Sequence, residues 1–153
     1  MVEARGLEEG DRAWARTQLE RAWGSVHVAR LGELIDASAL PALVAWDGDR
    51  RVGVVTYAIR GGECEVVSIS TDPQGSGAGR ALMGAVTDEA RRAGCTRLWL
   101  TTTDNNRRAR AFYERWGMRV ARVHHDGVKA SRTVKPSIPE AAVDEIEYEL
   151  RLV

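Results

Sequence analysis

The sequence predicts an α/β (α+β) domain in which helices cover a β-sheet. Three apolar runs follow one another as a strand meander, and polar or glycine turns at 47–49 and 61–62 separate them. Continuous apolar runs of this kind are typical of strands that are buried on both faces. Downstream, segments with helical spacing alternate with strand-like segments. A chain of 153 residues is expected to form one domain, 1–153. The meander strands are predicted at 43–46, 52–59 and 63–70.

Before the meander, one helix and one strand are predicted. Asp11 can cap a helix that continues to Trp23, and Gly24 can end it. The segment 25–31 is expected to form the first strand.

After the meander, the apolar spacing changes from strand to helix and back again. Leu82, Val86 and Ala90 recur at helical spacing in the first of these segments. The segment 126–144 carries two prolines and is too long for a hairpin turn, so a functional loop is expected there. The expected elements are a helix at 80–93, a strand at 96–102, a helix at 106–117, a strand at 118–125 and a final strand at 145–153.

A glycine-rich run between the third meander strand and the helix that follows it indicates a phosphate site. It reads Gln74-Gly75-Ser76-Gly77-Ala78-Gly79. Backbone N–H groups in such a loop can converge on an anion, and the helix dipole adds to the attraction. Arg80 follows where a nucleotide-binding P-loop needs lysine, and the glycine spacing differs from that of dinucleotide folds. A tight turn without a ligand is the structural alternative.

Two signatures together resemble the GCN5-related N-acetyltransferase (GNAT) superfamily. Gln74, Gly77 and Gly79 match its Gln-x-x-Gly-x-Gly pattern, and Asn106 and Tyr113 match the signature of the later helix. The resemblance spans about 40–125 and is closest to the bacterial-type single-domain members. It implies a mixed, mostly antiparallel twisted sheet of about six to seven strands, flanked by helices. The central strands of that fold are splayed around acetyl-CoA.

The resemblance also implies which residues contact acetyl-CoA. The end of the strand before the loop should bulge or splay, so that a backbone N–H can reach the thioester oxygen. Asn106 could instead serve only as a helix cap. The connection Thr71-Asp72-Pro73-Gln74 is shorter than the usual one, which puts contacts at the entry turn in doubt. The expected cofactor residues are Ile69, Ser70, Thr71, Gln74, Gly75, Ser76, Gly77, Ala78, Gly79, Arg80 and Asn106.

Acetyl transfer from a thioester to an amine needs an acid and a base. The resemblance places the acid, which would protonate the leaving thiolate, at Tyr113; otherwise the ring simply belongs to the apolar stripe of its helix. Glu65 stands where the histone-acetylating branch carries its catalytic glutamate. Glu63, one of His124 and His125, or an ordered water chain are the substitutes.

Composition limits the possible partners. Lys plus Arg and Asp plus Glu both number 22, so the net charge of +0 argues against nucleic acid or an anionic membrane as partner. No apolar run reaches the length of a membrane span, and the charged segment 1–11 has no signal-peptide core, so a cytoplasmic protein is expected. Cys64 and Cys95 are both placed in predicted strands and are expected to be buried free thiols. No metal site is expected.

The sequence therefore predicts an N-acetyltransferase that uses acetyl-CoA as co-substrate and a small-molecule or peptide amine as acceptor. A non-catalytic acyl-CoA-binding sensor or interaction module on the same fold is the alternative. The loop 126–144 is expected to fold over the acceptor pocket. The resemblance leaves a homodimer possible and does not identify the amine.

Overall fold

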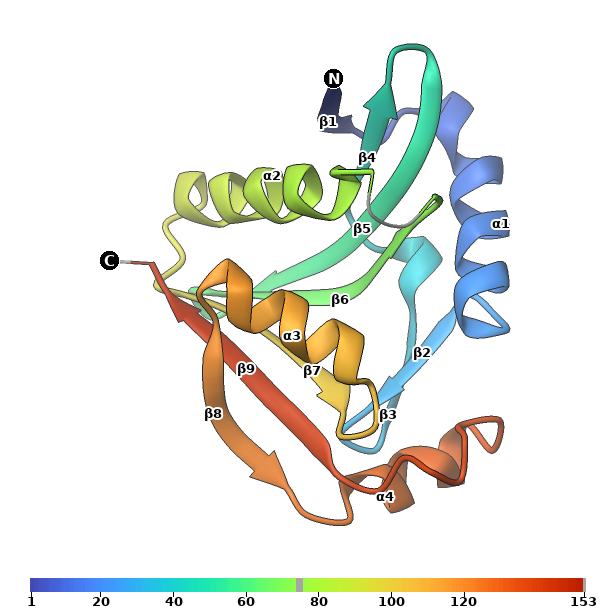
Figure 1. Ribbon diagram of the computed structural model, residues 1–153, viewed down its shortest axis with the longest axis vertical. Helices are drawn as coiled ribbons and strands as arrows, with labels where there is room; N and C mark the ends of the chain where they lie inside the picture. The colour runs from blue at the N-terminus through green and yellow to red at the C-terminus, as the bar shows by residue number, and fades with distance from the viewer. Residues whose placement is uncertain (74–75, 153) are drawn as a thin grey trace.

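The computed structural model describes residues 1–73 and 76–152, in which a seven-stranded sheet forms the centre (Figure 1). Its strand order is β1-β4-β5-β6-β7-β9-β8, and a separate two-stranded sheet is made by β2 and β3. Every neighbouring pair is antiparallel except β6 and β7, which run parallel. The strands are β1 (Val2–Gly6), β2 (His27–Arg30), β3 (Glu33–Asp36), β4 (Ala42–Asp47), β5 (Arg50–Arg60), β6 (Glu63–Thr71), β7 (Arg97–Thr103), β8 (Arg119–His124) and β9 (Glu145–Arg151).

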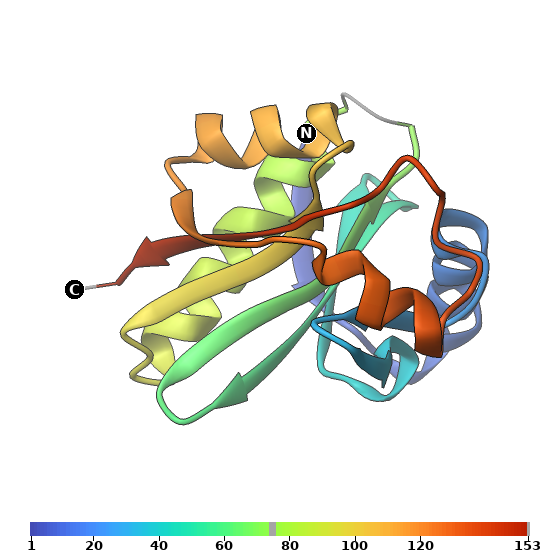
Figure 2. The same ribbon diagram turned by 90° about the horizontal axis from the view of Figure 1, so that it is seen from below.

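Helices lie on both faces of the large sheet (Figure 2). α2 (Ala78–Arg92) and α3 (Arg107–Trp116) cover one face, and α1 (Arg12–Trp23), α4 (Gly127–Val134) and the β2–β3 hairpin lie on the other. Short 3-10 helices, η1 (Glu9–Asp11) and η2 (Ala37–Ala39), flank this second group. Within the described ranges, no helix is long and apolar enough to cross a membrane.

The main core lies between α2, α3 and the sheet. Leu82, Met83 and Val86 are fully buried on α2, at the spacing that puts them on one helix face. They belong to the same apolar cluster as Val55 of β5 and Leu98 of β7. Because β5, β6 and β7 also pack on their other face, their apolar runs are nearly continuous, as the sequence predicted.

A second, smaller core holds α1 and the β2–β3 hairpin against the opposite face. Leu19 of α1, Val28 of β2 and Val67 of β6 are buried together there. Gly24 ends α1 in the left-handed conformation, with φ of 79°, as its position predicted. This second layer brings the β2–β3 hairpin under the middle of the large sheet.

The structure confirms some of the expected elements and corrects others. The strand expected at 25–31 is present as β2, which pairs with β3 in the separate hairpin. β1 and β3 were not predicted, because both are short and largely exposed and have little apolar pattern. The segment 126–144 is not a plain loop, since it contains α4. Cys95 is buried but precedes β7 and is not within a strand.

We predict that Gly53 of β5 is needed for the close approach of α2 to the sheet. A Cβ atom added there would lie 3.0 Å from Leu82 Cδ1 and 3.1 Å from the Ser70 carbonyl oxygen. Gly53→Ala should therefore lower the free energy of unfolding by about 1–3 kcal/mol, measured by urea denaturation. Gly6→Ala is the control, because a Cβ at Gly6 would have no neighbour within 4 Å. Equal unfolding midpoints for the two variants would contradict the prediction.

Candidate functional site

The site is an opening in the sheet where β6 and β7 separate. Only three residue pairs join these two strands, and the last pair is Glu65 with Trp99. Beyond it, β6 continues to Thr71 paired with β5, while β7 continues to Thr103 paired with β9. β6 stays paired with β5 and β7 stays paired with β9, so each strand remains hydrogen-bonded to one neighbour where the two diverge. The splayed central strands expected from the sequence are therefore present.

A bulge in β6 lies just beyond the point of divergence. The β5–β6 register passes from Thr56 opposite Ser68 to Tyr57 opposite Val66, so Val67 is the extra residue. A bulge bends its strand and redirects the adjacent backbone groups. The sequence placed such a distortion at Ile69–Thr71, whereas the structure has it two residues earlier. Ile69 packs against the main core, and Ser70 and Thr71 are half-buried at the end of the strand.

The N-terminus of α2 lies at the end of this strand. Gly77 is its N-cap residue and has φ of 90°, in the left-handed region where glycine is favoured. The first intrahelical bond runs from the Ala81 N–H to the Gly77 carbonyl oxygen, at 3.1 Å. The N–H groups of Ala78, Gly79 and Arg80 precede that bond, so they are available to an anion. The Ser76 hydroxyl is buried next to them and has no hydrogen-bond partner in residues 1–73 and 76–152.

Several predicted cofactor residues also have structural roles. A Cβ at Gly79 would lie 3.2 Å from the ring of Phe112, so this glycine lets α2 and α3 approach closely. Asn106 caps α3, with its side-chain oxygen accepting from the Ala109 N–H at 3.3 Å. Arg80 is exposed on the first turn of α2. Gln74 and Gly75, also predicted to bind the cofactor, lie outside the described residues.

Tyr113 is buried on the inner face of α3. Its ring centroid lies 5.6 Å from that of Phe112 and 6.0 Å from that of Tyr148. Burial raises the pKa of Tyr113 to about 12, so its hydroxyl stays protonated at neutral pH. Tyr148, in contrast, donates to Glu114 at 2.7 Å and accepts from Arg110.

Glu65 is held in a buried ion pair at the mouth of the opening. Arg30 of β2 donates to both of its carboxylate oxygens, at 2.6 Å each. Both side chains are about nine-tenths buried, and the guanidinium lies 5.6 Å from the centre of the Trp99 ring. The carboxylate and the nearby Glu33 raise the pKa of Arg30. Both oxygens of the Glu65 carboxylate are therefore already engaged by hydrogen bonds from a charged group.

The substitute side-chain bases also lie beside charged residues. Glu63 lies 3.3 Å from Arg97, which also bonds to Glu147 and Glu149 of β9. His124 is 3.0 Å from Glu147. His125 lies 3.5 Å from Asp144 and is largely exposed. No candidate base named from the sequence is therefore without a charged neighbour.

The segment 126–144 lies against the α1 side of the opening. α4 packs on the β2–β3 hairpin, where the Ser131 hydroxyl accepts from the Gly32 N–H at 3.0 Å. The buried Glu145 accepts from the Leu31 N–H at 2.8 Å and from the Ser131 hydroxyl at 2.5 Å. Lys135 donates to the carbonyl oxygens of Trp23 and His27. The segment is thus tied to the hairpin that carries Arg30.

Sequence reasoning missed Arg30. An arginine in a four-residue strand gives no local sign of which distant residue its side chain will contact.

The prediction that the two cysteines are buried free thiols is confirmed, and burial raises the pKa of Cys64 to about 12. Among the described residues, no group of three or more His, Cys, Asp or Glu side chains is arranged to hold a metal ion.

Comparison with known proteins identifies the family. The family model described as the acetyltransferase (GNAT) family matches residues 11–118, which is more than half of the chain. The chain belongs to the GNAT acetyltransferase family. The resemblance found in the loop and in the Tyr113 helix is therefore confirmed.

The chain is also similar to individual proteins. The chain is 34% identical over 121 residues to the uncharacterized protein YdhI of Bacillus subtilis, covering 78% of this chain and 76% of that protein. It superposes on yncA, a putative acetyltransferase from Salmonella typhimurium solved with acetyl-CoA, with a TM-score of 0.74 and 19% identity over 99% of this chain and 94% of that one. A Bacillus subtilis acetyltransferase in complex with CoA gives a TM-score of 0.70 at 18% identity over the full length of both chains. These two superpositions show that the fold is shared.

We predict that the Arg30–Glu65 pair is strongly coupled. Arg30→Met should lower the free energy of unfolding by about 3–5 kcal/mol, because it leaves the Glu65 carboxylate buried without its partner. Arg30→Met combined with Glu65→Met should lose much less, since no buried charge remains. Urea denaturation of the wild type, both single variants and the double variant completes the cycle. Additive losses would show that the two side chains do not interact as described.

Proposed function

We propose that the protein transfers an acetyl group from acetyl-CoA to a primary amine of a small molecule or peptide by direct attack. The separation of β6 from β7 beside the α2 N-terminus is the observation that carries this proposal. Beyond Glu65 and Trp99 the two strands no longer pair with each other, and we propose that an extended thioester lies between them with the N–H groups of the α2 N-terminus at one end. Membership of the acetyltransferase family and the ligands named for the two superposed structures support it.

The α2 N-terminus would bind the diphosphate of acetyl-CoA. N–H groups of Ala78, Gly79 and Arg80 point out of the helix end, and the helix dipole favours a negative charge there. The buried hydroxyl of Ser76 adds a further donor. Gln74 and Gly75 remain predicted contacts from the sequence pattern. Acetyl-CoA would act as co-substrate, and the reaction proposed here uses no metal.

Tyr113 would protonate the leaving thiolate. A tyrosine with a raised pKa transfers a proton readily only to a thiolate whose own pKa is raised. A thiolate buried beside Tyr113 meets that condition, because burial raises the pKa of a thiol as it does that of a phenol. The packing of the ring and the acid role are therefore compatible.

The amine would lose its proton through ordered water at the mouth of the opening. Neutralising a lysine-like amine at pH 7 requires about 4.6 kcal/mol, so a proton acceptor is needed. Glu65 was the first choice from the sequence, but both of its carboxylate oxygens already accept hydrogen bonds from Arg30. We propose that Glu65 acts through a water molecule at the edge of the pair.

The charged neighbours of the candidate bases are also compatible with a non-catalytic function. A protein that only binds acyl-CoA, as a sensor or interaction module, needs the loop and the opening but no free base. Every base candidate is paired here, as such a binding module would allow. Release of CoA thiol with a panel of amines, followed with a thiol-detecting reagent, separates the two functions: turnover with any amine supports the enzyme.

We predict that a negative charge at Gly77 weakens acetyl-CoA binding. Asp and Asn both tolerate positive φ, so Gly77→Asp and Gly77→Asn differ mainly in charge. A carboxylate about 4 Å from a phosphate is repelled by about 4 kcal/mol at an effective dielectric constant of ~20. Calorimetry should show acetyl-CoA affinity at least about tenfold weaker for Gly77→Asp than for Gly77→Asn. Equal affinities of the two variants for acetyl-CoA would show that the diphosphate does not bind at this helix end.

We predict that Tyr113→Phe lowers kcat by about 10²-fold or more with the best amine of the panel, because general acid catalysis is lost. Tyr57→Phe is the control, since Tyr57 is a partly buried tyrosine of β5 that packs on the main core. The thermal transitions of both variants show whether the fold is kept. Unchanged kcat in Tyr113→Phe would leave its ring with a packing role only.

A further inference from the structure

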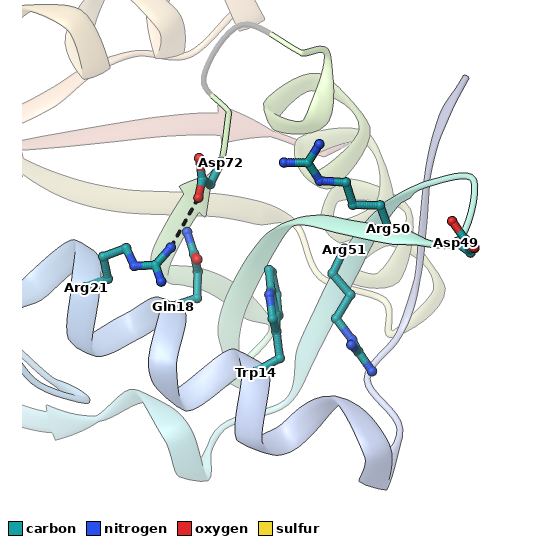
Figure 3. Close-up of a pocket in the computed structure, with 7 residues that line it drawn as sticks. All are labelled: Trp14, Gln18, Arg21, Asp49, Arg50, Arg51 and Asp72. Carbon is teal, nitrogen blue, oxygen red and sulfur yellow. Dashed lines mark hydrogen bonds and ion pairs between the residues drawn. The ribbon is translucent and has the colours of Figure 1, made fainter.

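A second hollow, with a volume of about 410 Å³, lies on the α1 side of the sheet. It is bounded by α1, by the start of β5 and by the residue that follows β6 (Figure 3). Its wall is unusually rich in polar side chains for a site beside a buried helix face. The residues that line it include Trp14, Gln18, Arg21, Arg50, Arg51 and Asp72.

Gln18 is the unusual member of this wall. It lies on the buried face of α1, between Ala15 and Leu19, where an apolar residue would pack, and only 5% of it is exposed. The structure records no hydrogen bond between its side-chain amide and any residue of 1–73 or 76–152. Figure 3 shows the amide directed toward the end of β6, where the hollow lies. Its amide atoms are not among the fully buried polar atoms that lack a partner, so they open onto the hollow and can hydrogen-bond to a molecule there.

The charged side chains of the wall favour an anion as that partner. Arg50 makes no ion pair with the described part of the chain, and Arg21 makes a single contact with Asp72, at 3.3 Å. Both guanidinium groups therefore keep free N–H donors, and they lie on either side of Gln18 and Trp14 in Figure 3.

Three further charged side chains line the hollow, and two of them are carboxylates from which a bound anion would have to stay apart. Arg51 is engaged elsewhere, with Asp11 at 2.9 Å and over the ring of Trp46 at 4.8 Å. Asp49 also lines the hollow, but its carboxylate points away from the other side chains (Figure 3). Asp72 is already held by Arg21.

We propose that this hollow binds a small organic anion through a carboxylate or phosphate group. Arg50 and Arg21 supply charged donors to that group, and the Gln18 amide supplies a neutral one. The indole ring of Trp14 rises from α1 between Gln18 and Arg51, so an organic part of the ligand can pack against it (Figure 3). None of the residues that line the hollow belongs to α2.

Two sources could supply this anion. One is a phosphate of CoA itself, reaching across the end of β6. The other is an independent molecule, such as an anionic effector or the acidic end of an acceptor. Both require the same donors, and occupancy of the protein by CoA distinguishes them.

The test is an NMR titration of the full chain with inorganic phosphate and, separately, with succinate. We expect saturable shifts of the Trp14 indole N–H and the Gln18 side-chain amide. Gln18→Leu and Arg50→Gln should each weaken the affinity by about tenfold, the effect of losing one good hydrogen-bond donor. The Gln18→Leu variant lacks the side-chain amide, so binding to it is followed by the shift of the Trp14 indole N–H signal. Arg91→Gln, which removes an exposed charge at the far end of α2, should leave the affinity unchanged.

Shifts that do not saturate, or an affinity that either Gln18→Leu or Arg50→Gln leaves unchanged, would overturn the proposal. Arg50 is exposed, so its variant should fold even if Gln18→Leu does not. The titration is then repeated with CoA bound. If CoA blocks the shifts and Arg50→Gln also weakens CoA binding, a CoA phosphate fills the site. If the anion still binds while CoA is bound, the ligand of the hollow is a molecule other than CoA. Either result supports an anion site in the hollow.

Discussion

The parallel contact between β6 and β7 ends after three residue pairs, and the candidate site depends on that ending. Beyond Glu65 and Trp99 each strand keeps one hydrogen-bonded neighbour, β5 or β9, and gives up the other. A sheet can tolerate such an opening only where the separated backbone groups find another partner. The bulge at Val67 bends β6 at this point, and the N-terminus of α2 lies at the far end of the strand.

The Arg30–Glu65 pair connects this opening to the second layer of the fold. Glu65 belongs to β6, and Arg30 belongs to the hairpin that α4 and Glu145 hold in place. The pair therefore couples the mouth of the opening to a segment that lies far away in the sequence. Its burial makes the arrangement sensitive to either partner, because one buried charge without the other is costly. The carboxylate that the sequence suggested as the base therefore already accepts two hydrogen bonds from Arg30.

Elements with strong local patterns were predictable. α2 and α3 have apolar residues at helical spacing, and Gly24 and Gly117 end helices by taking positive φ. β1, β3 and α4 have weaker patterns, and their neighbours across the fold decide their conformation: β1 pairs with β4, and α4 packs on the β2–β3 hairpin. The site could be located from Gly77, Gly79 and Tyr113, whereas Arg30 and Gln18 could not be found from local sequence.

The sequence by itself determined the family, the order of the central strands and helices, and the loop at which a diphosphate is proposed to bind. It did so because glycine spacing, helix caps and apolar periodicity act within a few residues of one another. Only the tertiary structure decided that Glu65 meets Arg30, that Gln18 faces a hollow beside Arg21 and Arg50, and that Val67 forms the bulge. These contacts join distant segments, and their energy depends on burial and geometry that no local pattern contains.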